Sequence, residues 1–505
     1  MKNSKTIYSC QNLIKIMEKY ETEDGLVFNL DTETFTAHLF ALKKGKDFII
    51  KKSVTYQSRE YIITDILSYP QYPLKSNKNI KSISFTDDSE LICIHSDSFN
   101  SSFIESLSIP ASLELLEDGW CSETKNLKYI KISPKNKNYM YIDNKMIIGK
   151  SDPKSDIYDV LSFVRRDAKE IKIPSFIKYI HSSTFDECID LTSIEIPDDS
   201  DLFSIGKCAF SNCPIQKLVI PAKLEVLQEG WCEDLKNVEE IIVSPENKLF
   251  SSLFENCCLI GKSSIDDDNY SIFYYATKDI VEILFPSYIK VISSFAFENS
   301  VIELVDFEPD SQLTLIDSFA FFDSSLYDIK IPPSTETIQR SAFSSSSLEN
   351  IVFLPKSKLS FIGYEAFEST YLDDVVIPSS VNFISERAFH CSKIHKLSFE
   401  ENSNLTTLNY EVFVGCKMKN IIIPANIKCI SSSVFNLCDR LISVEILSSS
   451  ISIGSNCFTD CFSFCLISLP NAESINIDQK AFHKVSKKIS LFICNNAKIN
   501  IVRKK

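Results

Sequence analysis

Few residues of this sequence combine the types and spacing that chemistry requires. The tripeptide GKS occurs at 149–151 and again at 261–263, where it is similar to the end of a phosphate-binding loop. The glycine that such a loop needs earlier is replaced by Asn144 in the first copy and by Asn256 in the second, and neither segment is expected to open a helix. We therefore interpret both tripeptides as turns.

The closest grouping of possible metal ligands is His390, Cys391 and His395. Phe389 and Cys391 occupy positions of a repeat described below, and no second ligand pair with zinc spacing lies nearby. The motifs G-x-S-x-G and H-E-x-x-H are also missing. The sequence therefore predicts no catalytic residue, no cofactor and no metal ion, and we expect a protein that is not an enzyme.

The charge of the chain limits its partners. A formal net charge of -14 argues against nucleic acid, because phosphate backbones are held by clustered lysine and arginine. The first twenty residues contain no apolar segment typical of a secretory signal, and no apolar run approaches the roughly 20 residues of a membrane-spanning helix. We expect no integral membrane segment.

Proline and phenylalanine recur at fixed intervals along the second half of the chain. Prolines fall on a 23-residue grid whose two vacant points hold Glu401 and Leu447. Phenylalanines from Phe297 to Phe435 are spaced alternately by 24 and 22 residues, so the full unit is a pair of turns of 46 residues. Such a period is typical of a solenoid. The grid prolines are Pro286, Pro309, Pro332, Pro355, Pro378, Pro424 and Pro470.

Each repeat reads as one turn of a β-rich coil. Segments such as LTSIEIP at 191–197 alternate apolar residues as a short strand does, and proline ends the strand. A second short apolar pair follows, and then Ala388-Phe389 and its equivalents turn the chain back. One turn cannot bury its own apolar side, so stacked turns must share one core. Three residues after the phenylalanine lies a small position that we expect to be half-buried; it is filled by Cys188, Cys213, Cys416, Cys438, Cys461, Ser300, Ser324, Ser346 and Thr370.

The combination of Leu-x-x-Ile-x-Ile-Pro, Val-x-x-Ile and Ala-Phe-x-x-Cys, as in LTSIEIP, VNFIS and FDEC, resembles the BspA-like leucine-rich repeats of the Treponema pallidum type over roughly residues 80–493. The resemblance implies a β-rich, right-handed leucine-rich-repeat solenoid of parallel short strands with turns of about 22–24 residues. Members occur in bacteria and in parasitic protists such as trichomonads, and several are similar to surface adhesins. The resemblance therefore also implies a protein ligand, such as a host or extracellular matrix protein.

Two segments break the repeat in the same way. Inserts near 135–170 and 246–282 belong to a block of about 112 residues that occurs twice. In each copy Gly-Trp, at 119–120 and 230–231, stands where Ala-Phe is expected. Each insert is either a structural addition that covers its own turn, which we favour, or a loop that contacts a ligand.

The ends of the chain differ from the repeat. Strands are predicted near 26–30 and 35–42 as a hairpin, with further strand-like alternation over 48–66, and a short helix is predicted within 1–24. A terminal cap is needed because the first turn would otherwise expose its core. We thus predict an N-terminal cap over 1–79, a solenoid over 80–493 and a tail over 494–505.

The face formed by the strands is the predicted binding site. In the pattern Ile-x-Ile the isoleucines point inward, so the middle residue points out and stacking aligns these residues. Exposed apolar residues often mark a partner site. β-Propensity alone, or an insert folded over the strands, would also explain them. The candidate residues are Val219, Ile242, Leu284, Val352, Val376 and Ile422, of which the first three are expected to form one run.

Two functions therefore remain open. One is a surface antigen or adhesin that binds proteins through the solenoid face, as the resemblance implies. The other is an intracellular scaffold for protein–protein interaction, favoured by the missing export and membrane segments and by the many cysteines. The sequence leaves the location of the protein undecided between the cell surface and the cytoplasm.

Overall fold

A computed structural model describes residues 17–68, 78–485, 489–493 and 498–502, which fall into two compact units. The first unit consists of Met1–Pro214 and Lys223–Trp231, and the second of Ile215–Ala222 and Cys232–Lys505. Every regular element within the described residues is a β-strand. No helix that could cross a membrane is found in this part of the chain. The predicted fold, a β-rich leucine-rich-repeat solenoid with a small N-terminal β cap, is confirmed.

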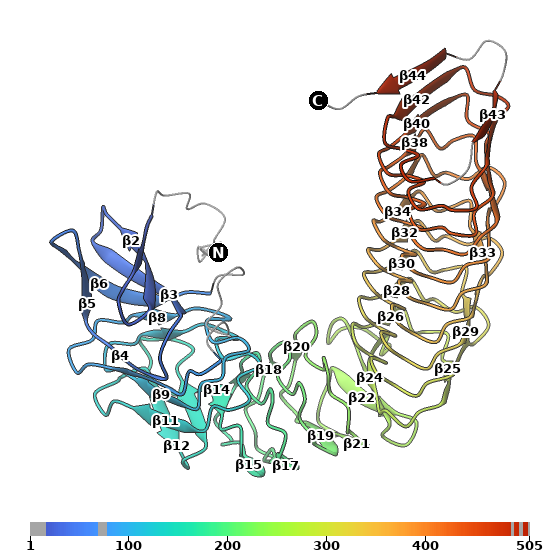
Figure 1. Cartoon of the computed structure of the whole chain (residues 1–505). Helices are drawn as coiled ribbons and strands as arrows, with labels where there is room; N and C mark the ends of the chain where they lie inside the picture. The colour runs from blue at the N-terminus through green and yellow to red at the C-terminus, as the bar shows by residue number, and fades with distance from the viewer. Residues whose placement is uncertain (1–16, 69–77, 486–488, 494–497, 503–505) are drawn as a thin grey trace. The chain divides into compact units, whose positions relative to one another are not determined.

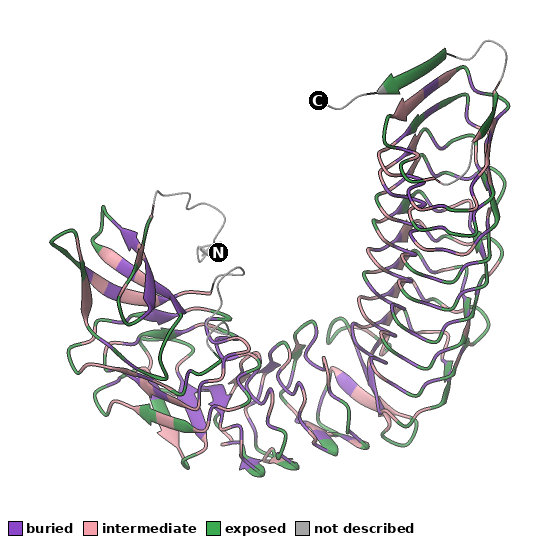
Figure 2. Cartoon of the chain, viewed as in Figure 1, coloured by how far each residue is buried: buried purple, intermediate pink, exposed green. Residues whose placement is uncertain are grey.

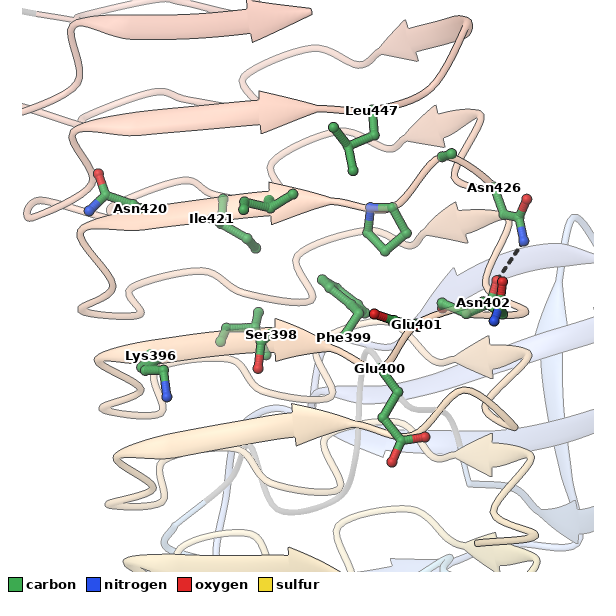
Figure 3. A pocket seen from close by; sticks show the side chains of 15 residues that line it. Lys396, Ser398, Phe399, Glu400, Glu401, Asn402, Asn420, Ile421, Asn426 and Leu447 are labelled. Atoms are coloured by element: carbon green, nitrogen blue, oxygen red, sulfur yellow. Dashed lines mark hydrogen bonds between the residues drawn. The ribbon is translucent and has the colours of Figure 1, made fainter. Parts of the chain in front are cut away.

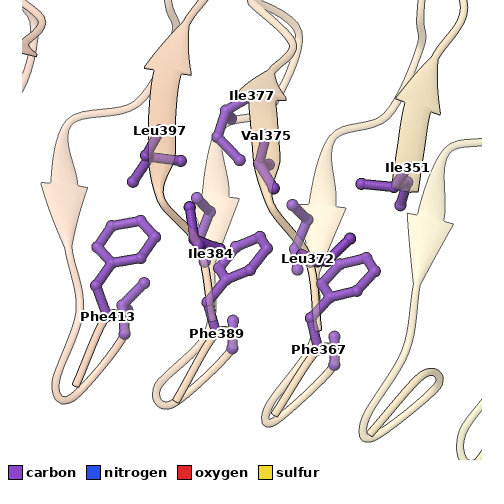
Figure 4. Close-up of a cluster of buried hydrophobic side chains, with 14 of the residues drawn as sticks. Ile351, Phe367, Leu372, Val375, Ile377, Ile384, Phe389, Leu397 and Phe413 are labelled. Carbon is purple, nitrogen blue, oxygen red and sulfur yellow. The ribbon is translucent and has the colours of Figure 1, made fainter. Parts of the chain in front are cut away.

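A single turn shows how the sequence builds the second unit. Strand β33 (Asp374–Ile377) has alternating exposed and buried residues and ends before Pro378. After a short loop, β34 (Phe383–Ile384) contributes one buried residue, and Ala388-Phe389 lies at the return corner. Inward side chains of both strands meet the phenylalanines of the corner, as Figure 4 shows. The predicted order of strand, proline, short apolar pair and Ala-Phe corner is therefore confirmed.

Stacked turns of the second unit form two ladders of parallel strands, one of four-residue and one mostly of two-residue strands (Figure 1). Buried and exposed residues alternate along them (Figure 2). The four-residue ladder comprises β19 (Lys217–Ile220), β21 (Glu240–Val243), β25 (Glu282–Phe285), β27 (Leu304–Phe307), β29 (Asp328–Ile331), β31 (Asn350–Phe353), β33, β35 (Lys396–Phe399), β37 (Asn420–Ile423), β39 (Ser443–Ile446), β41 (Leu466–Leu469) and β43 (Ser490–Ile493). The other ladder comprises β26 (Val291–Ile292), β28 (Leu315–Ile316), β30 (Thr337–Ile338), β32 (Phe361–Ile362), β34, β36 (Thr407–Leu408), β38 (Cys429–Ile430), β40 (Ser450–Ile453), β42 (Ser474–Asp478) and β44 (Lys498–Val502).

The return corner has its own hydrogen-bond ladder. The N–H of Phe297 donates to the carbonyl of Ala320 at 2.7 Å, and the N–H of Phe321 donates to Ala342 at 2.7 Å. The rings stack from turn to turn: Phe297, Phe321 and Phe343 have centroids 5.0 and 5.2 Å apart. Stacked rings at the spacing of paired strands fill the core continuously.

The small position three residues after each phenylalanine is fully buried, not half-buried as predicted. The hydroxyl of Ser300 donates to the carbonyl of Phe297 at 2.7 Å, and the hydroxyl of Thr370 donates to Phe367 at 2.9 Å. Where cysteine replaces serine, the Cys438 thiol donates to the carbonyl of Phe413 in the preceding turn at 3.1 Å. The position is small and polar because it must satisfy a buried carbonyl.

The first unit begins with the predicted hairpin, β2 (Leu26–Asp31) and β3 (Thr36–Leu42), which is confirmed. The short helix predicted within 1–24 is wrong for residues 18–21, which form β1 (Glu18–Glu21) paired with β2; residues 1–16 lie outside the described residues. Tyr20 and its neighbours complete the sheet edge instead of forming an isolated helix. The cap strand β6 (Arg59–Ile66) lies between β3 and β8 (Cys93–Ile94), so the cap sheet continues into the ladder.

The remaining strands of the first unit also form ladders. β5 (Ser53–Tyr56) pairs with β6, and β10 (Leu115–Leu116) pairs with β8. The four-residue side consists of β4 (Asp47–Ile50), β7 (Ser82–Phe85), β9 (Ser106–Ile109) and β11 (Tyr129–Ile132), followed by β15 (Glu170–Lys172) paired with β17 (Ser193–Glu195). The two-residue side continues with β16 (Tyr179–Ile180), β18 (Ser204–Ile205) and β20 (Val226–Leu227).

Each insert forms a three-stranded antiparallel meander that enters the core. The first consists of β12 (Tyr139–Ile142), β13 (Met146–Gly149) and β14 (Val160–Val164), and the second of β22 (Phe250–Leu253), β23 (Cys258–Gly261) and β24 (Ile272–Ala276). The last strand of each meander pairs in parallel with the next two-residue strand. Strands β13 and β23 are buried throughout. The structure therefore favours the structural interpretation of the inserts.

The corner of each duplicated block corrects the alignment made from sequence. The N–H of Phe99 donates to the carbonyl of Trp120 at 3.1 Å, which is the bond that Phe297 makes to Ala320. Trp120 therefore occupies the alanine position and Cys121 the phenylalanine position, so that Trp-Cys, not Gly-Trp, replaces Ala-Phe. Gly119 takes the residue before, where φ is +73° and where other turns also have positive φ.

Candidate protein-binding face

The outward residues of the four-residue strands in the second unit are the candidate site, which we call the strand face. Alternation along each strand directs its third residue outward, as at Ile422 in β37, which is 56% exposed beside buried Ile421 and Ile423. Five of the six residues predicted from sequence are exposed, and Val219 is half-buried. The exposed ones are Ile242, Leu284, Val352, Val376 and Ile422.

Strand pairing determines which candidate residues are neighbours. Val219 pairs with Ile242, as predicted, but Leu284 pairs with Asp306 on β27 and begins a separate sheet. The expected run of three apolar residues is therefore interrupted after Ile242, because the second meander lies between β21 and β25 in sequence. Val352 pairs with Lys330 and Val376 with Ser398. The strand face thus contains both apolar and polar side chains, and apolar ones adjoin at Val219 and Ile242.

A hollow of about 680 Å³ opens between β35 and β37 and the loops that follow them. Its apolar lining includes Phe399, Ile422 and Leu447, and Lys396 and Glu400 contribute charge (Figure 3). The Asn426 side chain crosses one end, where its amide donates to the carbonyl of Ser403 at 2.7 Å. An apolar lining with a few polar groups is suited to an apolar side chain presented by a polar backbone.

The hollow coincides with the two vacant points of the proline grid. Glu401 and Leu447 occupy positions that hold proline in neighbouring turns, and both line the hollow on either side of Pro424. The sheets also change here, because β33 and β35 form one sheet and β37 begins the next. The sequence therefore already marked this part of the solenoid as irregular.

Each GKS tripeptide begins with the last residue of a meander strand, Gly149 of β13 or Gly261 of β23, and continues into the loop that follows that strand, so the interpretation as a turn holds only for its lysine and serine. Ser151 donates from its N–H and its hydroxyl to the Asp159 carboxylate at 2.9 and 2.8 Å. In the second copy the Ser263 hydroxyl bonds to Asp267. A carboxylate fills the space where a phosphate would be expected, which is incompatible with a phosphate-binding loop.

His390 and His395 are oriented toward different carboxylates. His390 Nδ1 lies 3.0 Å from Glu368 Oε1, and His395 Nδ1 lies 2.7 Å from Asp373 Oδ1. Cys391 is exposed at a corner position with positive φ. The three residues are thus held by separate contacts and do not converge on a common point.

A buried ionic centre in the first block was not predicted from the sequence. The Arg166 guanidinium donates to the carbonyls of Thr184, Cys121 and Ser183 at 2.9, 3.1 and 3.2 Å. Nearby, Asp186 accepts the N–H of Glu123 at 2.6 Å. Both Arg166 and Asp186 are buried, and burial raises the pKa of Asp186 to about 6. We call this group the Arg166 centre.

The second block repeats the arrangement with a lysine in place of the arginine and a glutamate in place of the aspartate. Lys278 corresponds to Arg166, and Glu298 corresponds to Asp186 and accepts the N–H of Asp234 at 2.7 Å. Lys278 Nζ donates to the carbonyl of Glu298. Burial lowers the pKa of Lys278 to about 8 and raises that of Glu298 to about 7. The offset of 112 residues between the blocks would have revealed this Lys278 centre, had charged residues been aligned across it.

Both centres join the meander to the next turn, where the regular ladder is interrupted. Carbonyls that lose a ladder partner there must be satisfied by other donors. The guanidinium of Arg166 supplies several donors at once in a planar arrangement. Arg166, Asp186 and Glu298 are buried, and half-buried Lys278 donates to a backbone carbonyl, so we interpret both centres as structural components.

Comparisons with solved structures return leucine-rich repeat proteins. The pneumococcal vaccine antigen PcpA has 15% identity and a TM-score of 0.42 and covers 95% of this chain and 100% of its own. A leucine-rich repeat protein from Eubacterium ventriosum has 15% identity and a TM-score of 0.40, with 94% and 97% covered. A leucine rich cell surface protein from Faecalibacterium prausnitzii has 16% identity and a TM-score of 0.31, with 89% and 94% covered. Among curated proteins no match was found.

A family model gives the assignment. The BspA type leucine rich repeat region, a model of six copies, matches residues 62–148, 160–276, 268–395 and 406–502. These matches include most of both duplicated blocks and all six residues predicted for the candidate face. The chain therefore belongs to the BspA-type leucine-rich repeat family.

Proposed function

We propose that this protein binds another protein through the strand face of its second unit, without catalysing a reaction. The observation that carries the proposal is the hollow at β35 and β37, where exposed Ile422 adjoins a lining of Phe399 and Leu447. Exposed apolar residues cost solvation free energy unless a partner covers them. The family is one of repeat proteins suited to protein binding, which supports this class of function.

The chemistry of the hollow favours a partner segment in an extended conformation. Its lining offers apolar contact together with Asn402 and Asn420 as hydrogen-bonding side chains. An extended segment presents alternate side chains to one face and leaves its backbone free to bond to such groups. Lys396, paired with Asp374 at 2.7 Å, adds charge at the border of the site.

We expect acidic substitutions on the strand face to weaken binding selectively. The probes are a set of purified extracellular matrix proteins, including fibronectin, laminin and collagen, tested by biolayer interferometry against the full chain. Val376→Asp combined with Ile422→Asp should reduce affinity about 30-fold or more, because a buried hot spot contributes about 2 kcal/mol or more.

The matched control replaces two similarly exposed apolar residues outside the strand face, Phe383→Asp and Leu437→Asp. Binding should be retained in this variant. Binding that is lost in the control and kept in the strand-face variant would place the interface elsewhere, and failure of every matrix protein to bind would contradict an extracellular matrix ligand.

A scaffold inside the cell is the second candidate. Buried cysteines such as Cys416 and Cys438 are free thiols, which suits a reducing compartment. Protease treatment and impermeant biotin labelling of intact source cells distinguish the two. Labelling of this chain without labelling of a cytosolic control supports the adhesin; protection until lysis supports the scaffold.

A further inference from the structure

Neighbouring strands of the N-terminal cap and of the first solenoid turn bring two histidines, a carboxylate and a cysteine together. Asp65 on β6 is the register partner of His38 on β3 and of Cys93 on β8. His95 follows β8 by one residue, and its N–H donates to the carbonyl of Ile66 at 3.0 Å. The cluster is therefore fixed by the sheet itself and lies within the first unit.

The ligand atoms of three of these residues point toward one another. One oxygen of Asp65, the thiol sulfur of Cys93 and one ring nitrogen of His95 all lie within 4.8 Å of each other. His95 Nε2 lies 3.2 Å from Asp65 Oδ1. Cys93 is buried, whereas Asp65 and His95 are half-buried, so the cluster is open to solvent on one side.

A second layer of polar groups orients the cluster. Glu117 Oε1 lies 3.0 Å from His95 Nδ1, on the ring nitrogen opposite the one near Asp65. His38 Nδ1 lies 2.9 Å from Asp65 Oδ2, and the Thr64 hydroxyl donates to the same oxygen at 2.6 Å. A carboxylate on the far nitrogen of a histidine is the usual arrangement behind a metal-bound imidazole, because it fixes the tautomer and the ring orientation.

The donor set indicates which ion would bind. Zinc is bound by sulfur at about 2.3 Å, by imidazole nitrogen at about 2.0–2.1 Å and by carboxylate oxygen at about 2.0–2.2 Å. Mg²⁺ and Ca²⁺ prefer oxygen ligands only, so a thiol and an imidazole select against them. Donors bound at these lengths lie roughly 3–4 Å apart, which small rotations of Asp65 and Cys93 would achieve.

We propose that Asp65, Cys93 and His95 bind one zinc ion, with water in a fourth position and with Glu117 and His38 as positioning residues. The ion would join β6 to the turn that contains β7 and β8. It would thereby fasten the cap to the first turn of the solenoid.

The test is metal stoichiometry and affinity of the full chain. Purified protein is stripped with a chelator under reducing conditions, and Zn²⁺ or Co²⁺ alone is then added. Co²⁺ should produce a thiolate charge-transfer absorption band, and zinc should bind with one more equivalent in the wild type than in His95→Gln or Cys93→Ser.

The matched control replaces Cys391 and His395, which also combine a cysteine with a histidine but are oriented apart. Cys391→Ser with His395→Gln should keep the extra equivalent. Loss of an equivalent in this control, or equal binding by wild type and His95→Gln, would overturn the proposal by identifying nonspecific binding.

Glu117→Gln provides a second test in case substitution of a ligand prevents folding. It leaves all three ligands in place and should weaken zinc binding about 10-fold or more without changing the stoichiometry. Near-ultraviolet circular dichroism confirms folding of each variant. Unchanged affinity in a folded Glu117→Gln variant would contradict its positioning role, and a folded Asp65→Asn variant with unchanged zinc affinity would contradict the site.

Discussion

The two duplicated blocks use the same plan with different buried charges. In the first, Arg166 is buried and donates to several carbonyls, while in the second Lys278 is half-buried and donates to the carbonyl of Glu298. The carboxylate that accepts a corner N–H is Asp186 in one and Glu298 in the other. In both blocks, therefore, a cationic side chain next to the inserted meander supplies donors to backbone carbonyls.

The Trp-Cys corner leaves room for the guanidinium of Arg166 in the first block. Trp120 fills the alanine position against Phe99 and Phe163, with ring centroids 5.9 and 5.8 Å away. Cys121 occupies the phenylalanine position and is much smaller, and Arg166 Nη2 lies 3.4 Å from its sulfur. The guanidinium thus occupies volume that a phenylalanine ring takes in other turns.

Removal of the cationic side chain should reduce the stability of each block more than the other substitutions proposed below. Arg166→Met is expected to lower the free energy of unfolding of the first block by about 3–5 kcal/mol, because several buried carbonyls lose their donor and Asp186 loses a nearby positive charge. Lys278→Met should cost about 1–3 kcal/mol, since water reaches a half-buried site. Urea unfolding is followed by tryptophan fluorescence, with Trp231→Phe to isolate Trp120 and Trp120→Phe to isolate Trp231. Equal losses of unfolding free energy in the two blocks would show that the difference in burial between Arg166 and Lys278 has no effect on stability.

Exchange of the cations should have an intermediate effect. Arg166→Lys is expected to cost about 2–3 kcal/mol, because an ammonium cannot reproduce the planar set of donors. The reverse change, Lys278→Arg, should alter stability by less than about 1 kcal/mol, as the added length can extend to solvent. The same fluorescence measurement applies. A harmless Arg166→Lys would show that charge alone, and not donor geometry, is required.

The buried carboxylates should make stability depend on pH. A folded-state pKa raised from 4.5 to about 7 for Glu298 means that the folded protein binds the proton more tightly than the unfolded chain. This stabilisation is complete below about pH 4.5 and is lost as pH rises to about 7. For Asp186 the corresponding window lies between 3.8 and about 6. Charged groups near Glu298 are Lys278, Glu233 and Asp234, and those near Asp186 are Arg166, Glu123 and Glu187.

Neutral substitutions test this dependence. Glu298→Gln keeps the acceptor for the N–H of Asp234 and should remove about 1–2 kcal/mol of pH-dependent change from the second block only. Asp186→Asn should do the same in the first block over its lower window. Unfolding midpoints from pH 4 to pH 8 provide the measurement. A wild-type pH profile that persists in Glu298→Gln would assign the dependence to other groups.

The smallest effect is expected at the thiol. Cys121→Ser should change the stability of the first block by less than about 1 kcal/mol, because the hydroxyl is similar in size and still accepts from Arg166. Cys232→Ser is the matching change in the second block. Loss of several kcal/mol at Cys121 alone would indicate that the polarizable sulfur is essential next to the guanidinium.

The regular part of this fold could be predicted because each recurring position of the repeat has a single local structural role. Apolar alternation, Pro378 at a strand end and Phe389 at a corner are repeated with constant spacing, so one interpretation applies to every turn. Exposure of Val376 and Ile422 followed from the same alternation. The hollow around Ile422 could not be predicted from this alternation, because its shape depends on how the side chains of adjacent turns fit together.

The sequence by itself determined the solenoid, its phenylalanine core, its N-terminal hairpin and its family, since all of these rest on periodicity and local preference. Only the tertiary structure decided which distant residues meet. Asp65, Cys93 and His95 converge because parallel strands align residues far apart in sequence, and Arg166 reaches Cys121 across 45 residues. The physical reason is that a strand's register and a side chain's burial are properties of the stacked turns together, and no single repeat contains them.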